Sequence, residues 1–266
     1  MHVAVALLVS CLLACAGTRT QYARAPDAAL TFDRAAAPKE ALDVADKVLA
    51  AHGGAPAWEA AKQIRWKQTM LHNGQPVATG EQAWDRWNAR HFAKLDREKG
   101  AFGVMYELYG SFAAGYIEGR SGTKQVVPTG EAAEGVVVAR RGWQRDTLAL
   151  FAAFLLHEPG ATLVYGGIVR DNELELHDLT LTFDPKDPAR AGIVVHVYAN
   201  AATSLVRRVE LELGGERFGY VIDAYQATGG LQVPAKFTNL GSGDVFEIKD
   251  VTVGSPDDDL YIAPVS

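Results

Sequence analysis

The spacing of apolar residues changes from a helical to a strand period early in the chain. Apolar residues recur at intervals of three and four between residues 39 and 51, and Gly53-Gly54 follows them. This pattern predicts an amphipathic helix that ends at the two glycines. Pro56 is a favourable first residue for a second short helix, which is expected to run to about Lys62. From Ile64 onward apolar residues recur at every second position, which indicates strands.

Alternating apolar and polar residues predict an antiparallel sheet over most of the remaining chain. The first strand covers about residues 64–71, and Asn73-Gly74 is a strong signal for a tight turn into a return strand at residues 75–85. The same alternation predicts further strands at residues 90–95, 104–109, 113–118, 174–183, 193–199, 204–213, 217–225, 231–238 and 244–253. We therefore expect a mainly β fold of the α+β class with about 10–11 strands.

One long helical segment, roughly residues 130–156, interrupts the strands and is expected to break near Gly142. Its second half is apolar on more than one face, so neighbouring elements must cover several of its sides. The apolar residues there include Leu148, Leu150, Phe151, Phe154, Leu155 and Leu156. Many predicted strands are apolar on one face only, as in a sheet curled round one apolar concavity. We predict a curved antiparallel half-barrel with N-terminal helices and an inserted helical lid, formed by a single domain at residues 39–266.

The first 16 residues are apolar and resemble the hydrophobic region of a secretory signal peptide. Leu12-Leu13-Ala14-Cys15 is similar to the bacterial lipobox, in which the cysteine is lipidated, and it predicts a lipid anchor on Cys15. Lipidation at Cys11 and ordinary cleavage after Ala16 are the alternatives. By resemblance to Gram-negative lipoproteins, Ala16 after the cysteine implies the outer membrane, with the protein facing the periplasm. Residues 17–38 are Ala-rich without apolar periodicity, which is typical of a flexible tether.

Composition and charge narrow the classes of function. The chain has 266 residues, of which 48% are hydrophobic and 22% are charged, as expected for a globular protein. Its net charge of −6 argues against binding to nucleic acid, which requires a basic surface. It also argues against electrostatic docking on anionic lipid, so membrane association would depend on the acyl anchor. Both cysteines precede residue 16, which excludes disulfides, thiolate metal sites and cysteine nucleophiles from the folded domain.

The sequence contains no motif of a known catalytic or cofactor site. It lacks GxSxG, P-loop and GxGxxG motifs, and its seven histidines form no HxH, HxxxH or HExxH spacing. The best candidate for a catalytic constellation is His177 and His196 with Asp178 and Asp223. Ordinary cross-strand polar contacts are the simpler interpretation of these four residues. We therefore predict that the protein is not an enzyme and holds no metal or cofactor.

Several short patches resemble bacterial LolA/LolB-like proteins. They are the helix stop at residues 51–54, Trp84-Asp85-Arg86-Trp87, residues 158–167 (EPGATLVYGG) and residues 259–264 near the C-terminus. The resemblance extends over about residues 39–266. It implies a half-open antiparallel barrel closed by helices, in a protein of the bacterial cell envelope. It also implies a protein that carries or receives lipidated proteins or other hydrophobic ligands.

Aromatic residues of the first strands are expected to meet the inserted helix and to line an apolar cavity beneath residues 143–156. The candidate ligand-binding residues are Trp66, Met70, Trp84, Tyr106, Phe151 and Phe154. Such a cavity binds through the apolar area removed from water and needs no catalytic residue. A packed core is the alternative interpretation of these residues. We predict an envelope lipoprotein that binds a hydrophobic ligand or acyl chain; the alternatives are an interaction protein with a solid core and a hydrolase that uses the histidines above.

Overall fold

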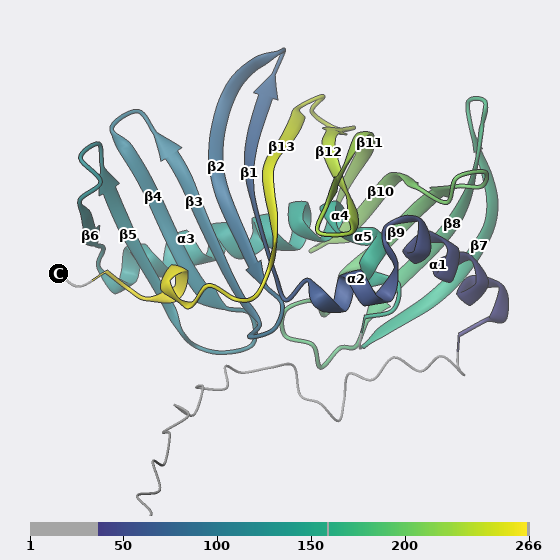
Figure 1. Ribbon diagram of the computed structural model, residues 1–266, viewed down its shortest axis with the longest axis horizontal. Helices are drawn as coiled ribbons and strands as arrows, with labels where there is room; N and C mark the ends of the chain where they lie inside the picture. The colour runs from purple at the N-terminus through teal and green to yellow at the C-terminus, as the bar shows by residue number, and fades with distance from the viewer. Residues whose placement is uncertain (1–36, 159, 265–266) are drawn as a thin grey trace, which may run out of the picture.

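The computed structural model describes residues 37–158 and 160–264. The predicted signal peptide, the predicted lipidation site Cys15 and nearly all of the predicted tether lie outside these residues. Within them, 13 strands form one open antiparallel sheet with the order β6-β5-β4-β3-β2-β1-β13-β12-β11-β10-β9-β8-β7 (Figure 1). The predicted curved half-barrel with helices is therefore confirmed, and it contains more strands than expected.

The sheet consists of two meanders that meet at its centre, where β1 pairs with β13. The first meander contains β1 (Gln63–His72), β2 (Gln75–Asp85), β3 (Arg90–Arg97), β4 (Gly100–Glu107), β5 (Ala113–Gly119) and β6 (Lys124–Val126). The second contains β7 (Ala161–Asp171), β8 (Leu174–Phe183), β9 (Val194–Asn200), β10 (Val206–Leu213), β11 (Glu216–Thr228), β12 (Leu231–Asn239) and β13 (Val245–Gly254). Because β6 and β7 are the two edges of the sheet, the helical segment between them must cross its hollow.

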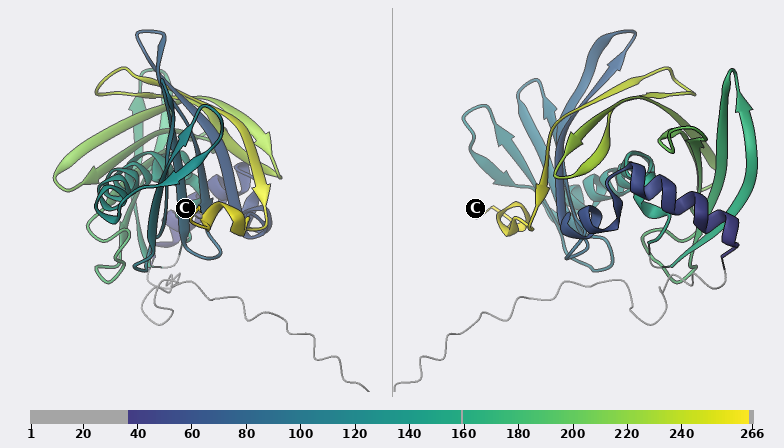
Figure 2. Two further views of the ribbon diagram at one scale, coloured as in Figure 1. Left: turned by 90° about the vertical axis from the view of Figure 1, so that its left-hand side faces the viewer. Right: turned by 45° about the vertical axis from the view of Figure 1, so that its right-hand side comes forward.

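The helices lie in the hollow of the sheet, which arches around them (Figure 2). They are α1 (Lys39–Ala51), α2 (Gly54–Ala60), α3 (Thr129–Gly142), α4 (Leu148–Leu150) and α5 (Ala152–Leu155). Residues Trp143–Thr147 form one π-helical turn between α3 and α4, so the predicted break near Gly142 is confirmed. The first helix has the predicted bounds, and the second begins two residues earlier than predicted.

The main core lies between the concave face of the sheet and the inserted helices. Every residue from position 148 to position 156 is buried, because strands cover this segment on several sides. The Phe151 ring lies 5.5 Å from that of Trp66 in an edge-on contact, and the Phe154 ring stacks on Trp58 at 4.3 Å between ring centroids. The prediction that the apolar segment fills the open side of the curved sheet is confirmed.

A smaller core covers the convex face of the first meander, beneath the C-terminal segment. It contains Ala83, Phe92, Met105, Tyr116 and Tyr261, which come from β2, β3, β4, β5 and the final 3-10 turn (Asp258–Tyr261). The Tyr261 hydroxyl donates to the carbonyl of Ala83 at 3.4 Å. This contact and the apolar burial fix the end of the described chain to the outside of the sheet.

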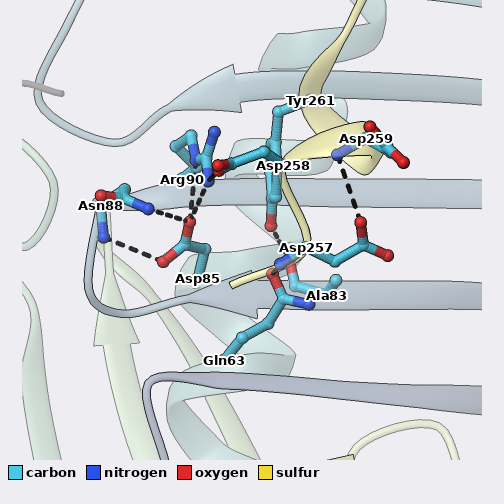
Figure 3. A network of polar contacts seen from close by, with 9 residues as sticks. All are labelled: Gln63, Ala83, Asp85, Asn88, Arg90, Asp257, Asp258, Asp259 and Tyr261. Atoms are coloured by element: carbon cyan, nitrogen blue, oxygen red, sulfur yellow. Dashed lines mark hydrogen bonds and ion pairs between the residues drawn. The ribbon is translucent and has the colours of Figure 1, made fainter. Parts of the chain in front are cut away.

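A buried ion pair lies beside this smaller core (Figure 3). The side chains of Arg90 and Asp85 are both fully buried, and Arg90 donates to Asp85 from Nε at 2.8 Å and from Nη2 at 2.5 Å. Arg90 Nη2 also lies 2.6 Å from a carboxylate oxygen of Asp258, in the C-terminal segment. Asn88 donates to Asp85 through its backbone and side-chain nitrogens. The network thus joins the β2–β3 turn to the end of the chain.

Two strands are absent from the sequence prediction. One is β6, which has three residues and is too short to show an alternating pattern. The other is β7, whose buried and exposed positions alternate regularly, although its pairing with β8 shifts register between Tyr165 and Gly167. The exposed residues Val164 and Ile168 also place large apolar side chains on its outer face. The sheet therefore has 13 strands where 10–11 were expected.

Candidate functional site

A groove lies between α3 and the concave face of the first meander. Its volume is about 550 Å³, within the roughly 300–1,000 Å³ of small-molecule sites. Its apolar lining consists of Met70, Ala78, Ala93, Leu95, Phe102, Val104, Ile117, Val138, Ala139 and Phe246. The groove opens to solvent, since Leu95, Ile117 and Val138 are 47%, 46% and 74% exposed.

One face of α3 and the following π-helical turn forms the wall of the groove. Gly135, Val138, Gly142 and Arg145 line it at intervals of three or four residues, as expected for one helical face. Gly135 lets the helix approach β4, because a Cβ there would lie 2.6 Å from a ring carbon of Phe102. A Cβ on Gly142 would meet no atom within 4 Å, so the groove is empty at that point.

The end of the groove nearest β11 carries an ion pair. Arg145 donates to Asp146 from Nε at 2.6 Å and from Nη2 at 2.7 Å, and the Tyr220 hydroxyl donates to Asp146 at 2.8 Å. The hydrogen bond to Asp146 raises the pKa of Arg145 above its ordinary value, and burial raises the pKa of Tyr220. Both charged residues belong to the π-helical turn, a rare geometry that is frequent at functional sites.

The structure separates the six residues predicted to bind ligand. Met70 lines the groove. The other five, Trp66, Trp84, Tyr106, Phe151 and Phe154, are at most 6% exposed and belong to the main core. The three from strands share the concave face with the groove but lie deeper, where α4 and α5 fill the hollow. The cavity therefore lies beside α3 and reaches only the start of residues 143–156, the segment expected to cover it.

The sequence reasoning missed the residues of α3 and the π-helical turn that line the groove. Two signals were available in the sequence. Gly135 and Gly142 are seven residues apart, which places both on one face of a helix. Arg145 and Asp146 lie directly before the strongly apolar segment at residues 148–156, and a charged pair there indicates a polar site against the core.

The four residues of the alternative catalytic constellation lie on the second meander, and none of them lines the groove beside α3. The Nδ1 atom of His177 lies 2.8 Å from a tyrosine hydroxyl, and that of His196 lies 3.0 Å from a threonine hydroxyl. Asp223 accepts a hydrogen bond from a threonine at 2.7 Å, and burial raises the pKa of Asp178. These are cross-strand polar contacts of the kind that the simpler interpretation expects.

Two patches that carry the family resemblance meet in a second ionic contact. Arg86 stacks on the Trp58 ring at 3.3 Å and lies 3.0 Å from Glu158, which begins the EPGATLVYGG patch. The indole nitrogen of Trp58 donates to the same Glu158 oxygen at 3.0 Å. The contacts tie the end of the inserted helices to the first meander. They have a structural role and lie outside the groove lining.

In residues 37–158 and 160–264, no group of three or more His, Cys, Asp or Glu side chains is arranged to hold a metal ion. No helix in the same part of the chain combines the length and the apolar character that crossing a bilayer requires.

No protein-family model matches the sequence, and no curated protein matches it. A LolA superfamily protein from Nitrosomonas europaea has a similar fold at 10% identity and a TM-score of 0.49, over 84% of this chain and 97% of that one. A DUF1329 family protein from Desulfovibrio piger is 8% identical, with a TM-score of 0.47 over 84% and 97% of the chains. The lipoprotein LppX of Mycobacterium tuberculosis is 10% identical, with a TM-score of 0.28 over 81% and 97%.

Proposed function

We propose that this protein binds an apolar molecule such as an acyl chain in the groove beside α3, without acting on it chemically. The observation that carries the proposal is the open groove itself, whose lining is mostly apolar. A chain bound there would cover Leu95, Ile117 and Val138, which are otherwise exposed. Each square ångström of apolar surface removed from water contributes roughly 25 cal/mol to such binding.

Gly142→Leu tests the proposal by filling the groove. Gly142 has helical backbone angles, φ −60° and ψ −44°, and open space where a side chain would extend. A leucine there therefore enters the groove, where the ligand would lie, and its Cβ contacts no other part of the protein. Leucine also has a higher helix propensity than glycine, by up to about 1 kcal/mol, so the variant is expected to fold well.

Gly130→Leu is the matched control. Gly130 belongs to the same helix, is exposed and has no atom within 4 Å of an added Cβ, but it does not line the groove. Both variants therefore add the same side chain to α3, and only one of them blocks the site.

The measurements are native mass spectrometry of the protein extracted from cell envelopes and titration with the neutral fluorescent probe N-phenyl-1-naphthylamine. The wild type and Gly130→Leu are expected to retain lipid and to bind the probe. Gly142→Leu is expected to lose the lipid and to bind the probe at least about tenfold more weakly, a difference of about 1.4 kcal/mol. Equal binding by all three proteins, or no binding by the wild type, would refute the proposal.

Anchoring of the protein to the outer membrane through Cys15 is part of the proposed function. The lipobox-like sequence before Cys15 supports it, as does the acidic net charge of −6, which disfavours electrostatic membrane binding. The intact mass of membrane-extracted protein is expected to show a chain that begins at Cys15 and carries acyl groups. Cys15→Ser is expected to remove them and Cys11→Ser to keep them. An unacylated wild-type chain that begins at Gly17 would contradict the anchor.

A further inference from the structure

The carboxylate at the charged end of the groove is already fully engaged by the protein. Asp146 is only 7% exposed and accepts two hydrogen bonds from Arg145 and one from Tyr220. Its negative charge is balanced by the guanidinium that it contacts. The pair as a whole is therefore close to neutral, and Asp146 offers little to a ligand.

The guanidinium of Arg145, by contrast, has donor capacity left. Its side chain is 34% exposed and lines the groove, with Nε and Nη2 directed to Asp146. Neither of its hydrogen bonds to Asp146 uses Nη1. A guanidinium carries five N–H donors, so Arg145 can donate to a ligand without releasing Asp146. A hydrogen bond to a charged donor contributes more than one between neutral groups.

We infer that Arg145 selects a ligand with a neutral carbonyl group next to its acyl chain, such as the ester of a monoacylglycerol. This inference rests on the proposed function, because it assigns the head group of the same ligand. An ester carbonyl accepts from Arg145 Nη1 without bringing a charge into the groove. A carboxylate in that position would place a second anion beside Asp146, and the two would compete for one cation.

The shape of the groove determines how such a ligand lies. The lining residues of α3 and the π-helical turn extend from Glu134 to Asp146, a distance of about 18 Å at 1.5 Å per residue. The acyl chain passes Gly142 and Val138 with its ester at Arg145. The amides of Gln68 and Gln82, which are hydrogen-bonded at 3.2 Å, line the groove as well and offer partners for glycerol hydroxyls.

A matched set of ligands tests the selection. The probes are 1-monolauroylglycerol, its ether analogue 1-O-dodecylglycerol, which lacks the carbonyl, and laurate, which carries a carboxylate. Their affinities are measured by displacement of N-phenyl-1-naphthylamine from the full-length protein at neutral pH. The wild type is expected to bind the ester about tenfold more tightly than the ether, and laurate more weakly than the ester.

Arg145→Lys and Arg145→Met identify the residue responsible. Lysine keeps a cation beside Asp146, and so protects the fold, but lacks the fork-shaped guanidinium with its remaining Nη1 donors. Both variants are expected to bind ester and ether equally, with unchanged affinity for the ether. If the methionine variant fails to fold, the lysine variant decides the question alone.

Three results would overturn the inference while leaving the proposed function intact. They are equal binding of ester and ether by the wild type, a preference that survives in Arg145→Lys, and tighter binding of laurate than of the ester. Failure of the proposed function itself is recognised differently. In that case the wild type binds none of the three ligands, and Gly142→Leu behaves like Gly130→Leu.

Discussion

Removal of the buried cation at the convex face, by Arg90→Met, is expected to destabilise the protein strongly. Arg90 and Asp85 are both fully buried, and two of the four hydrogen bonds to Asp85 come from Arg90. Methionine keeps an apolar stem against Tyr261 but leaves the carboxylate of Asp85 without its counter-ion. The two hydrogen bonds from Asn88 to Asp85 remain, but they stabilise the negative charge of the carboxylate only in part.

The magnitude follows from the burial of the two partners. Removing one member of a buried ion pair costs about 3–5 kcal/mol, because the other charge stays in a poorly solvated site. The contact with Asp258, which is 51% exposed, adds at most about 1 kcal/mol. We therefore expect a loss of about 4 kcal/mol for Arg90→Met and of less than about 1 kcal/mol for the control Asp258→Asn.

Urea unfolding followed by tryptophan fluorescence measures these losses as shifts of the midpoint at constant slope. The double variant Asp85→Asn/Arg90→Met removes the isolated charge as well as the cation. It is expected to be more stable than Arg90→Met alone by at least about 1 kcal/mol, since the two residues form one interacting pair. The reasoning fails if Arg90→Met costs less than Asp258→Asn, or if the double variant is the least stable of the three.

Three further predictions concern burial and space. Burial lowers the pKa of His91 to about 3, compared with 6.5 in the unfolded chain. The free energy of unfolding is therefore expected to fall as the pH drops from 6.5 toward 3, by up to about 1.4 kcal/mol per pH unit. The urea midpoint of His91→Leu should depend less on pH than that of the wild type. Gly135→Ala is expected to cost about 1–3 kcal/mol through its clash with Phe102, whereas Gly142→Ala, which has open space for its Cβ, is expected to stabilise the protein by up to about 1 kcal/mol. Equal thermal midpoints of the two variants would contradict this. Tyr261→Ala is expected to cost about 3–5 kcal/mol in urea unfolding by emptying the smaller core, and a loss below 1 kcal/mol would count against that core.

The sequence predicted correctly those helices and turns that are determined by residues close together in the chain. Lys39–Ala51 has the predicted helix bounds, because its apolar stripe and the following glycines agree. The β1–β2 hairpin turns at Asn73 and Gly74 with φ of 50° and 77°, the left-handed backbone that this residue pair favours. β7 escaped prediction because the exposed residues Val164 and Ile168 are apolar too, so that the sequence does not alternate although the burial does.

The position of the groove was not predictable in the same way. Periodicity shows which face of a strand is apolar, and Trp66, Gln68 and Met70 of β1 do share the concave face. It does not show how deeply the inserted helices enter the hollow. Phe151 covers Trp66 at 5.5 Å, whereas Met70, four residues further along the strand, lines the open groove. Only the path of α3 across the sheet distinguishes the two positions.

The pairing of β1 with β13 has a consequence for how the protein is made. Gln63 lies opposite Gly254, so the centre of the sheet joins the first strand of the chain to the last. Until β13 has been synthesised, β1 and β12 each present an unpaired edge, and such edges are templates for aggregation. Contacts between residues so far apart in the chain also slow folding. The newly made chain is therefore most vulnerable at what becomes the middle of the finished sheet, and a chain that ends before Val245 would keep that weakness permanently.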